Sequence, residues 1–126
     1  MNCAEKPCPT CPWRRSSTVG GADIPGFSIE DMRRPANTVP PRGTAQDGFL
    51  TIMACHHSKP GQEYACAGYI AQHGQSNINV RFMARAGTDL NKVLANCAGI
   101  DLYDNFYEML DTFEAALAVQ DNESFR

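Results

Sequence analysis

The stretch that decides the fold is Cys8-Pro9-Thr10-Cys11-Pro12-Trp13-Arg14-Arg15, near the start of the chain. Its prolines lack the backbone N–H that a helix needs, so the sequence predicts a tight turn here, called the knuckle below. The two-residue spacer between Cys8 and Cys11 lets both thiolates reach one metal ion, with each sulfur about 2.3 Å from it. The knuckle therefore predicts half of a tetrahedral metal site.

Cys55 and Cys66 are predicted to supply the second pair of ligands. Residues 48–55 form a short apolar run with β-branched residues in its middle, which is typical of a buried strand. Residues 64–73 fit a short helix that begins near Cys66. Because structural zinc takes four N or S ligands, often as two pairs, the sequence predicts one structural Zn²⁺ ion. Its predicted ligands are Cys8, Cys11, Cys55 and Cys66.

His56 is the alternative to Cys55 in this prediction. Adjacent side chains of an extended segment point to opposite sides, so we expect only one of the two to face the metal. If Cys55 faces the core, His56 or His57 replaces it and the site has three cysteines and one histidine. Otherwise the two histidines form an exposed turn.

Zinc is not the only cofactor that four thiolates can hold. An iron–sulfur cluster is the alternative, because four cysteines serve both. The start of the chain does not have the pattern of a signal peptide, so we expect a reducing compartment in which the six cysteines are thiols or metal ligands. A redox Cys-x-x-Cys pair would sit at a helix start after a strand, which the knuckle does not fit.

The rest of the chain predicts one domain over residues 1–126, with an α+β fold that is mostly helical and has a short sheet or a single strand. Residues 16–47 are predicted to form a long loop, tied down by the metal at its root. Ser28 is expected to cap a short helical turn within it. Further helices are expected over 77–86 (capped by Ser76), 89–97 (capped by Thr88) and 101–118, and residues 120–126 are expected to form a flexible tail.

Composition excludes some function classes. The chain is 43% hydrophobic and 20% charged, which is ordinary for a globular domain and argues against disorder. No run of about 18 apolar residues is present, so no transmembrane helix is predicted. A net charge of −3 gives no global attraction to nucleic acids. A local one is still conceivable at the knuckle, where Trp13 could stack on a base and Arg14 and Arg15 could bind phosphate; the alternative is that Trp13 packs over the zinc.

Four short motifs resemble a family of small uncharacterised proteins from bacteriophages and actinobacteria. They are Cys8-x-x-Cys11-Pro12-Trp13-Arg14, Ala54-Cys55-His56, Cys66-Ala67-Gly68-Tyr69 and Asn79-x-Arg81. The resemblance implies a metal site, a phage origin and the cytoplasm of the host cell. It also favours His56 as a ligand, because this residue recurs in the pattern beside Cys55.

These observations favour a non-enzymatic phage accessory protein that binds zinc and acts by binding a host or phage macromolecule. The first alternative is a metal-dependent hydrolase with three protein ligands and an open position, in which His56, His57 or Glu63 moves protons. The second is a regulator that binds nucleic acid through Trp13, Arg14 and Arg15.

Overall fold

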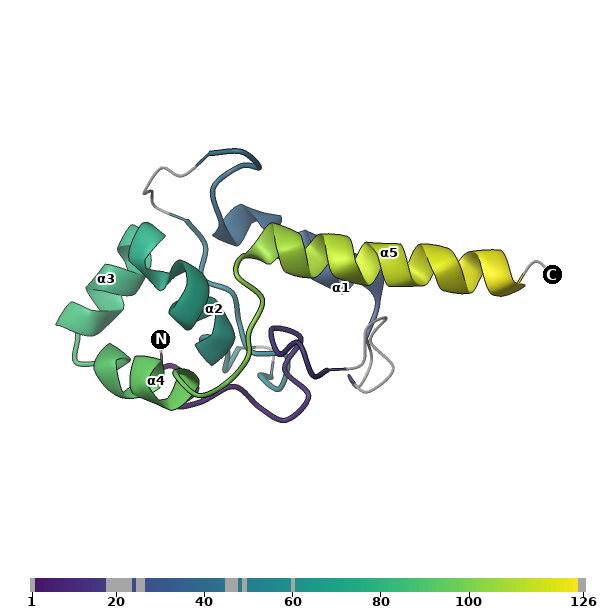
Figure 1. The fold of residues 1–126 in the computed structure, drawn as a ribbon. Helices are drawn as coiled ribbons and strands as arrows, with labels where there is room; N and C mark the ends of the chain where they lie inside the picture. Colours follow the sequence, from purple (N-terminus) through teal and green to yellow (C-terminus); the bar gives the residue numbers. More distant parts are fainter. Residues whose placement is uncertain are drawn as a thin grey trace.

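The computed structural model describes residues 2–17, 24, 27–44, 48, 50–59 and 61–124. Its helices, in chain order, are α1 (Ile29–Arg33), the 3₁₀ helix η1 (Arg34–Thr38), α2 (Ala67–His73), the 3₁₀ helix η2 (Gly74–Ser76), α3 (Ile78–Arg85), α4 (Leu90–Cys97) and α5 (Phe106–Ser124). Figure 1 shows α2, α3 and α4 grouped together, while α5 extends away from them. The prediction of a mostly helical domain is confirmed.

Pairing between extended segments is limited, in the described part of the chain, to isolated β-bridges. The described residues of the run 48–55, which leave out Phe49, therefore do not form the expected strand, and the sheet of the α+β prediction is not shown. The reason is local. The chain turns directly after Cys55, and Cys66 is already the N-cap residue of a helix. The residues that follow Ala54 and Ala65 are therefore not extended, and the bridge between these two does not grow into a ladder. The bridges pair Cys3 with Ala65, Arg14 with Leu102, Gly48 with Asn77, Ala54 with Ala65, and Lys59 with Gln62.

Side chains cap the short helices close to where the sequence predicts. Ser28 caps α1 as expected, accepting a backbone N–H of the first turn. Helix α3 confirms the helix expected over 77–86, but its cap is Asn77 and not Ser76. Helix α4 is capped by Asp89 and not by Thr88. In both cases the capping oxygen lies one residue later than predicted.

Helix α5 begins later than the predicted 101–118 helix. The Asn105 side chain accepts the N–H of Glu108 at 2.9 Å and so starts the helix at Phe106. The preceding residues run beside the knuckle, where Tyr103 N–H donates to the Trp13 carbonyl at 2.9 Å. The helix continues to Ser124, through most of the 120–126 segment predicted to be a flexible tail.

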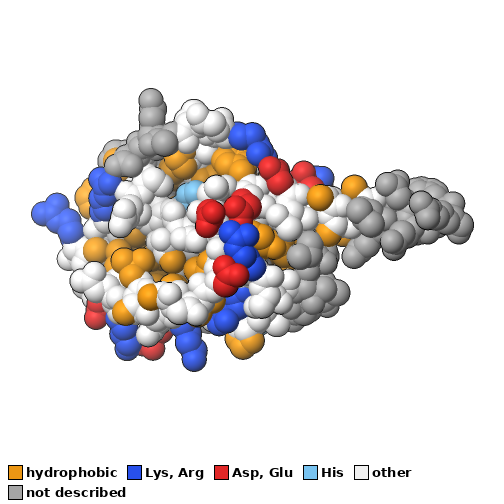
Figure 2. Space-filling model, in the orientation of Figure 1, with side chains coloured by type: hydrophobic (Ala, Val, Ile, Leu, Met, Phe, Trp, Pro, Cys, Tyr) orange, Lys and Arg blue, Asp and Glu red, His pale blue; other side chains and the backbone are white. Residues whose placement is uncertain are grey.

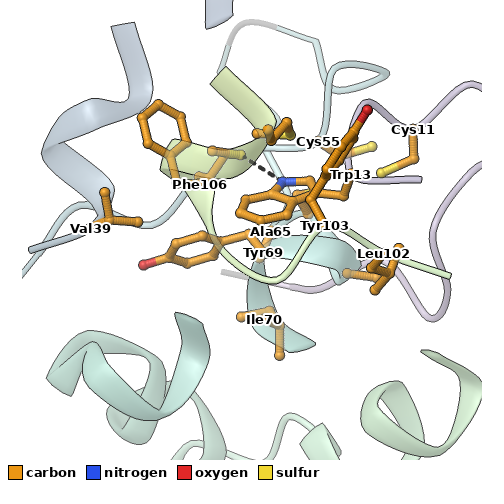
Figure 3. Close-up of a cluster of buried hydrophobic side chains, with 14 of the residues drawn as sticks. Cys11, Trp13, Val39, Cys55, Ala65, Tyr69, Ile70, Leu102, Tyr103 and Phe106 are labelled. Atoms are coloured by element: carbon orange, nitrogen blue, oxygen red, sulfur yellow. Dashed lines mark hydrogen bonds between the residues drawn. The ribbon is translucent and has the colours of Figure 1, made fainter. Parts of the chain in front are cut away.

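The core is built around Trp13, which is fully buried. Figure 3 shows its indole among Tyr69, Tyr103 and Phe106, side chains from α2, from the segment before α5 and from α5 itself. The indole N–H donates to the Met53 sulfur at 3.3 Å. Trp13 thus packs into the core and joins the knuckle to the helices.

Gly68 lets α2 approach Trp13. A Cβ added to Gly68 would lie 2.7 Å from Trp13 Cβ and 2.8 Å from its Cγ, closer than carbon atoms approach. Those atoms lie next to the Trp13 backbone, so the contact cannot be relieved by a side-chain rotation. We expect Gly68→Ala to lower the free energy of unfolding by about 1–3 kcal/mol through overpacking. Chemical denaturation measures it, and Gly99→Ala, where an added Cβ meets nothing within 4 Å, is the matched control.

Residues 27–44, called the arm below, carry α1 and η1 and lie within the predicted long loop. Two buried or half-buried tyrosines hold the arm: Tyr69 Oη donates to the Thr38 carbonyl at 2.6 Å, and Tyr107 Oη donates to the Pro40 carbonyl at 2.9 Å. Two ion pairs join it to α5, Arg33 with Glu114 at 2.7 Å and Arg42 with Asp111 at 2.9 Å. Helices α2 and α5 therefore anchor the arm, whereas the sequence analysis expected the metal to hold this loop in place.

His73 joins α2 to the start of α5. Its Nε2 accepts the N–H of Phe106 at 2.9 Å, which requires the neutral imidazole. Burial lowers the pKa of His73. The His73 imidazole therefore takes up a proton at about pH 6.5 in the unfolded chain, but only at a lower pH in the folded chain. This contribution to stability is constant above about pH 6.5 and falls as the pH decreases below it.

We expect His73→Gln to abolish this pH-dependent contribution. At pH 7.5 the variant is less stable, by on the order of 1 kcal/mol, because the Phe106 N–H loses its acceptor. The advantage of the wild type should shrink between pH 6.5 and pH 5.5, as only the wild-type imidazole is titrated. Thermal melts of both proteins across this range measure the difference, and acid effects on other groups cancel in it. A difference that is constant with pH contradicts the prediction.

Candidate metal centre

The knuckle folds as the sequence predicts, as a succession of turns. Cys11 N–H donates to the Cys8 carbonyl at 3.1 Å, and Arg14 N–H donates to the Cys11 carbonyl at 3.0 Å. The Arg14 guanidinium then reaches back, with Nε 2.8 Å from the Cys8 carbonyl and Nη2 2.7 Å from the Pro7 carbonyl. Ser17 Oγ donates to the Cys11 carbonyl at 2.6 Å. The backbone carrying both cysteines is thus held by side chains of the same segment.

The second pair of cysteines lies on two segments that contact each other. Cys55 N–H donates to the Tyr64 carbonyl at 2.8 Å, and Cys66 N–H donates to the Met53 carbonyl at 2.9 Å. Cys66 is also the N-cap residue of α2. Its pKa is lowered, first by the Cys11 side chain, against the effect of burial, and then by the backbone N–H groups of Tyr69 and Gly68.

Three of the predicted ligands form a group that could hold a metal ion. The ligand atoms of Cys8, Cys55 and His56 all lie within 4.8 Å of one another. Cys8 Sγ is 3.7 Å from His56 Nε2. Cys55 is buried, Cys8 is half-buried and His56 is exposed, so the group lies at the edge of the core.

Cys11 and Cys66, the other two predicted ligands, are buried and are not members of this group. The Cys11 side chain interacts with both Cys66 and Cys8, and these interactions, together with burial, raise its pKa. Cys8 shows the opposite change: the Cys11 side chain lowers its pKa to about 5, against burial and with help from His56 and Thr10. The lowered pKa favours the thiolate form of Cys8, which is the form that binds metals.

The structure brings Cys55 and His56 to the same group, against the expectation that only one of them could face it. The alternation of side chains holds only in extended backbone. Here a turn begins at Cys55, whose carbonyl accepts the N–H of Ser58 at 2.9 Å. The expectation that only one of the two faces the metal required extended backbone at both Cys55 and His56. Which of the two binds the metal stays a prediction.

One neighbour of the group, Thr10, was not singled out from the sequence. Thr10 Oγ1 lies 3.1 Å from His56 Nε2 and 3.5 Å from His57 Nε2, so the residue between the knuckle cysteines bonds to the histidines. Arg14 supports the knuckle by donating to the carbonyls of Cys8 and Pro7. The position of Thr10 inside the Cys-x-x-Cys spacer was the available signal. Glu63, named for the hydrolase alternative, instead accepts the N–H of Gly61 at 3.0 Å.

The nucleic-acid hypothesis named Trp13, Arg14 and Arg15. Trp13 is fully buried, so its indole has no face available to a base, and Arg14 donates to the knuckle carbonyls. Arg15 is paired with acidic groups, and on the face that Figure 2 draws, basic and acidic side chains lie next to one another. These placements leave the hypothesis without its stacking residue. The partners of Arg15 are Asp101, Asp104 and Glu108.

Cys3 and Cys97 lie outside the group of Cys8, Cys55 and His56. Cys97 is buried, with its Sγ 3.7 Å from the Ala67 carbonyl. Burial is the main cause that raises the pKa of Cys3, to about 12. Both are protonated thiols at neutral pH and serve below as controls.

Comparisons with known proteins come down to one family. No curated protein and no solved structure matches the chain. None of the helices in the described residues is both long enough and apolar enough to cross a membrane. The model of a family described as a family of unknown function (DUF6283) matches residues 3–123, which is nearly the whole chain. The chain therefore belongs to this family of unknown function.

Proposed function

We propose that this protein binds one structural Zn²⁺ ion through Cys8, Cys11, Cys66 and either Cys55 or His56. The observation that carries the proposal is the meeting of two thiols and an imidazole, from the knuckle and from residues 55–56, at one place. Cys8, Cys55 and His56 lie within 4.8 Å of one another, and Cys11 interacts with both Cys8 and Cys66. Thiolate and imidazole are the donors that zinc prefers in closed, four-ligand sites.

A structural role fits the way these segments are otherwise connected. In the described residues, two backbone hydrogen bonds and one isolated bridge join the 53–56 segment to residues 64–66 just before α2, whereas the knuckle contacts the 53–56 segment through the Trp13 side chain. A domain of this size buries only about 65–70% of its surface on folding. An ion that binds all three segments adds the cross-link that a sheet would otherwise provide.

The biological role that follows from this proposal is that of a phage accessory protein, which acts in the host cytoplasm by binding a host or phage macromolecule. It is supported by the resemblance of the four motifs to phage proteins. Unchanged binding of DNA and RNA by Arg14→Ala and Arg15→Ala variants removes the alternative of a regulator that binds nucleic acid through Trp13, Arg14 and Arg15. A turnover that Cys8→Ser abolishes in a folded protein contradicts the non-enzymatic role.

A metal-dependent hydrolase is the second candidate, and a specific observation favours it. Cys8, Cys55 and His56 alone would give three ligands and leave the fourth position open to water, as in catalytic zinc sites. The ring of His57 lies beside that of His56, with centroids 4.2 Å apart, where it could move a proton.

The zinc content of single variants separates the two candidates. For the structural site we expect Cys8→Ser, Cys11→Ser and Cys66→Ser to lose the zinc. For a three-ligand site, Cys11→Ser and Cys66→Ser keep it, whereas Cys8→Ser, Cys55→Ser and His56→Ala lose it. Elemental analysis of the purified proteins measures this, and Cys3→Ser and Cys97→Ser are the controls. Iron together with visible absorbance would overturn the zinc proposal in favour of an iron–sulfur cluster.

A further inference from the structure

A cavity of about 540 Å³ lies between the arm and the segment that carries Cys55. Small-molecule sites in proteins typically measure about 300–1,000 Å³ and are mostly apolar. Both properties hold here, since most of the wall is formed by aliphatic, aromatic and thioether side chains. The apolar residues that matter below are Pro12, Phe27, Met32, Ile52, Met53 and Met109.

The walls of this cavity are held in place by the fold. One wall is the arm, which Tyr69 and Tyr107 fix through the carbonyls of Thr38 and Pro40. Another is the stretch before Cys55, where Met53 accepts the indole N–H of Trp13. The cavity is therefore preformed, and a ligand entering it does not have to order the chain first.

The chemistry of the wall indicates a neutral ligand. Its two formally charged residues, Asp31 and Arg34, pair with each other, with Arg34 Nη1 3.2 Å from Asp31 Oδ1. Their charges compensate one another, so neither an anion nor a cation finds an unpaired partner among them. Three methionines line the cavity, and their flexible thioether side chains adapt to apolar shapes.

We propose that this cavity is the binding site of a neutral, largely apolar small molecule. The site goes beyond zinc binding, and its occupant is recognised by apolar contact with Phe27, Ile52 and the three methionines. His56 and Cys66 also line the cavity, so the ligand lies next to the proposed metal centre.

The methionines provide a test on the unmodified protein. Met32, Met53 and Met109 line the cavity, whereas Met83 is buried on α3 outside it. We expect N-phenyl-1-naphthylamine, a neutral apolar fluorophore, to shift the ¹³C-methyl NMR signals of the three lining methionines and to leave Met83 unchanged. Shifts that saturate at one equivalent support the proposal. The absence of saturable shifts, or shifts that are largest at Met83, overturns it.

Two variants test the location independently of the methionine signals. Ala54 and Thr51 are exposed residues of the wall, and Phe at either position adds bulk to the cavity. We expect Ala54→Phe and Thr51→Phe to weaken binding of the fluorophore about tenfold or more. Phe82→Ser, which removes an exposed aromatic on α3, is the control and should leave binding unchanged. Wild-type affinity in both folded wall variants, or loss only in Phe82→Ser, contradicts the site.

The charge class has its own comparison. The sulfonated analogue 1-anilinonaphthalene-8-sulfonate has the same ring system with a negative charge, and we expect it to bind more weakly. Tighter binding of the sulfonate contradicts a neutral ligand. Zinc content is measured on the same samples. If the folded protein contains no metal but still binds the fluorophore, the zinc proposal is refuted and the proposal of a small-molecule site is retained.

Discussion

Removal of the proposed zinc ion is expected to unfold this protein. Structural zinc binds to small domains with a free energy of about 10–16 kcal/mol at neutral pH. A domain of this size has a total stability of about 5–15 kcal/mol, so the loss of the ion removes most or all of it. The reason is specific to this fold: Cys11 and Cys66 are buried, and without an ion their thiols lie in the core with no ligand between the knuckle and α2.

The measurement is circular dichroism during titration with a strong zinc chelator. We expect the helical signal to fall in step with zinc release and to return when Zn²⁺ is added back. Cys97→Ser keeps all proposed ligands and controls for the effect of losing a buried thiol: its zinc content and its midpoint should stay near those of the wild type. A metal-free protein that keeps its helical signal and its melting transition would falsify the structural role.

Trp13→Ala is expected to be the most destabilising single substitution outside the metal ligands. Trp13 is fully buried, and replacement of a buried Trp by Ala typically costs about 3–5 kcal/mol. For a chain of this length the melting temperature should fall by on the order of 10–20 °C. The variant also leaves Gly68 without the ring against which α2 is positioned.

Two comparisons sharpen this second experiment. Phe82→Ala removes an aromatic side chain that is 51% exposed, and its cost should be about 1 kcal/mol or less. Zinc content of Trp13→Ala below its melting transition shows whether the loss comes from the core or from the metal. We expect the zinc to be retained, because Trp13 contributes no ligand atom. An equal loss of stability in both variants means that Trp13 is not the centre of the core.

The short helices were predictable because their signals are local. Ser28 lies in the right place to cap α1, and the apolar pattern that predicts α3 and α4 needs only neighbouring residues to form. The cap positions differ by one residue because Asn77 and Asp89 follow hydroxyl residues that could also cap. A choice between two adjacent caps depends on small energy differences, about 1 kcal/mol or less, which a pattern does not resolve.

The start of α5 and the missing strand were not predictable, for the opposite reason. The Phe106 N–H is accepted by His73, a residue of α2, and Tyr103 donates to Trp13 in the knuckle. These contacts keep residues 101–104 out of the helix, although their apolar pattern continues that of the helix. In the same way, the run 48–55 has the composition of a strand but lacks a partner segment long enough to pair with it in the described residues.

For the candidate metal centre, the sequence by itself determined the donors: the spacing of Cys8 and Cys11 and the prolines around them make a knuckle whatever it packs against. Only the tertiary structure decided that Cys55 and His56 both come close to Cys8 and that Trp13 lies in the core. The physical reason is the range of the interactions. A turn is fixed by backbone restrictions over a few residues, whereas a metal group and a buried indole depend on segments that the folded chain brings together.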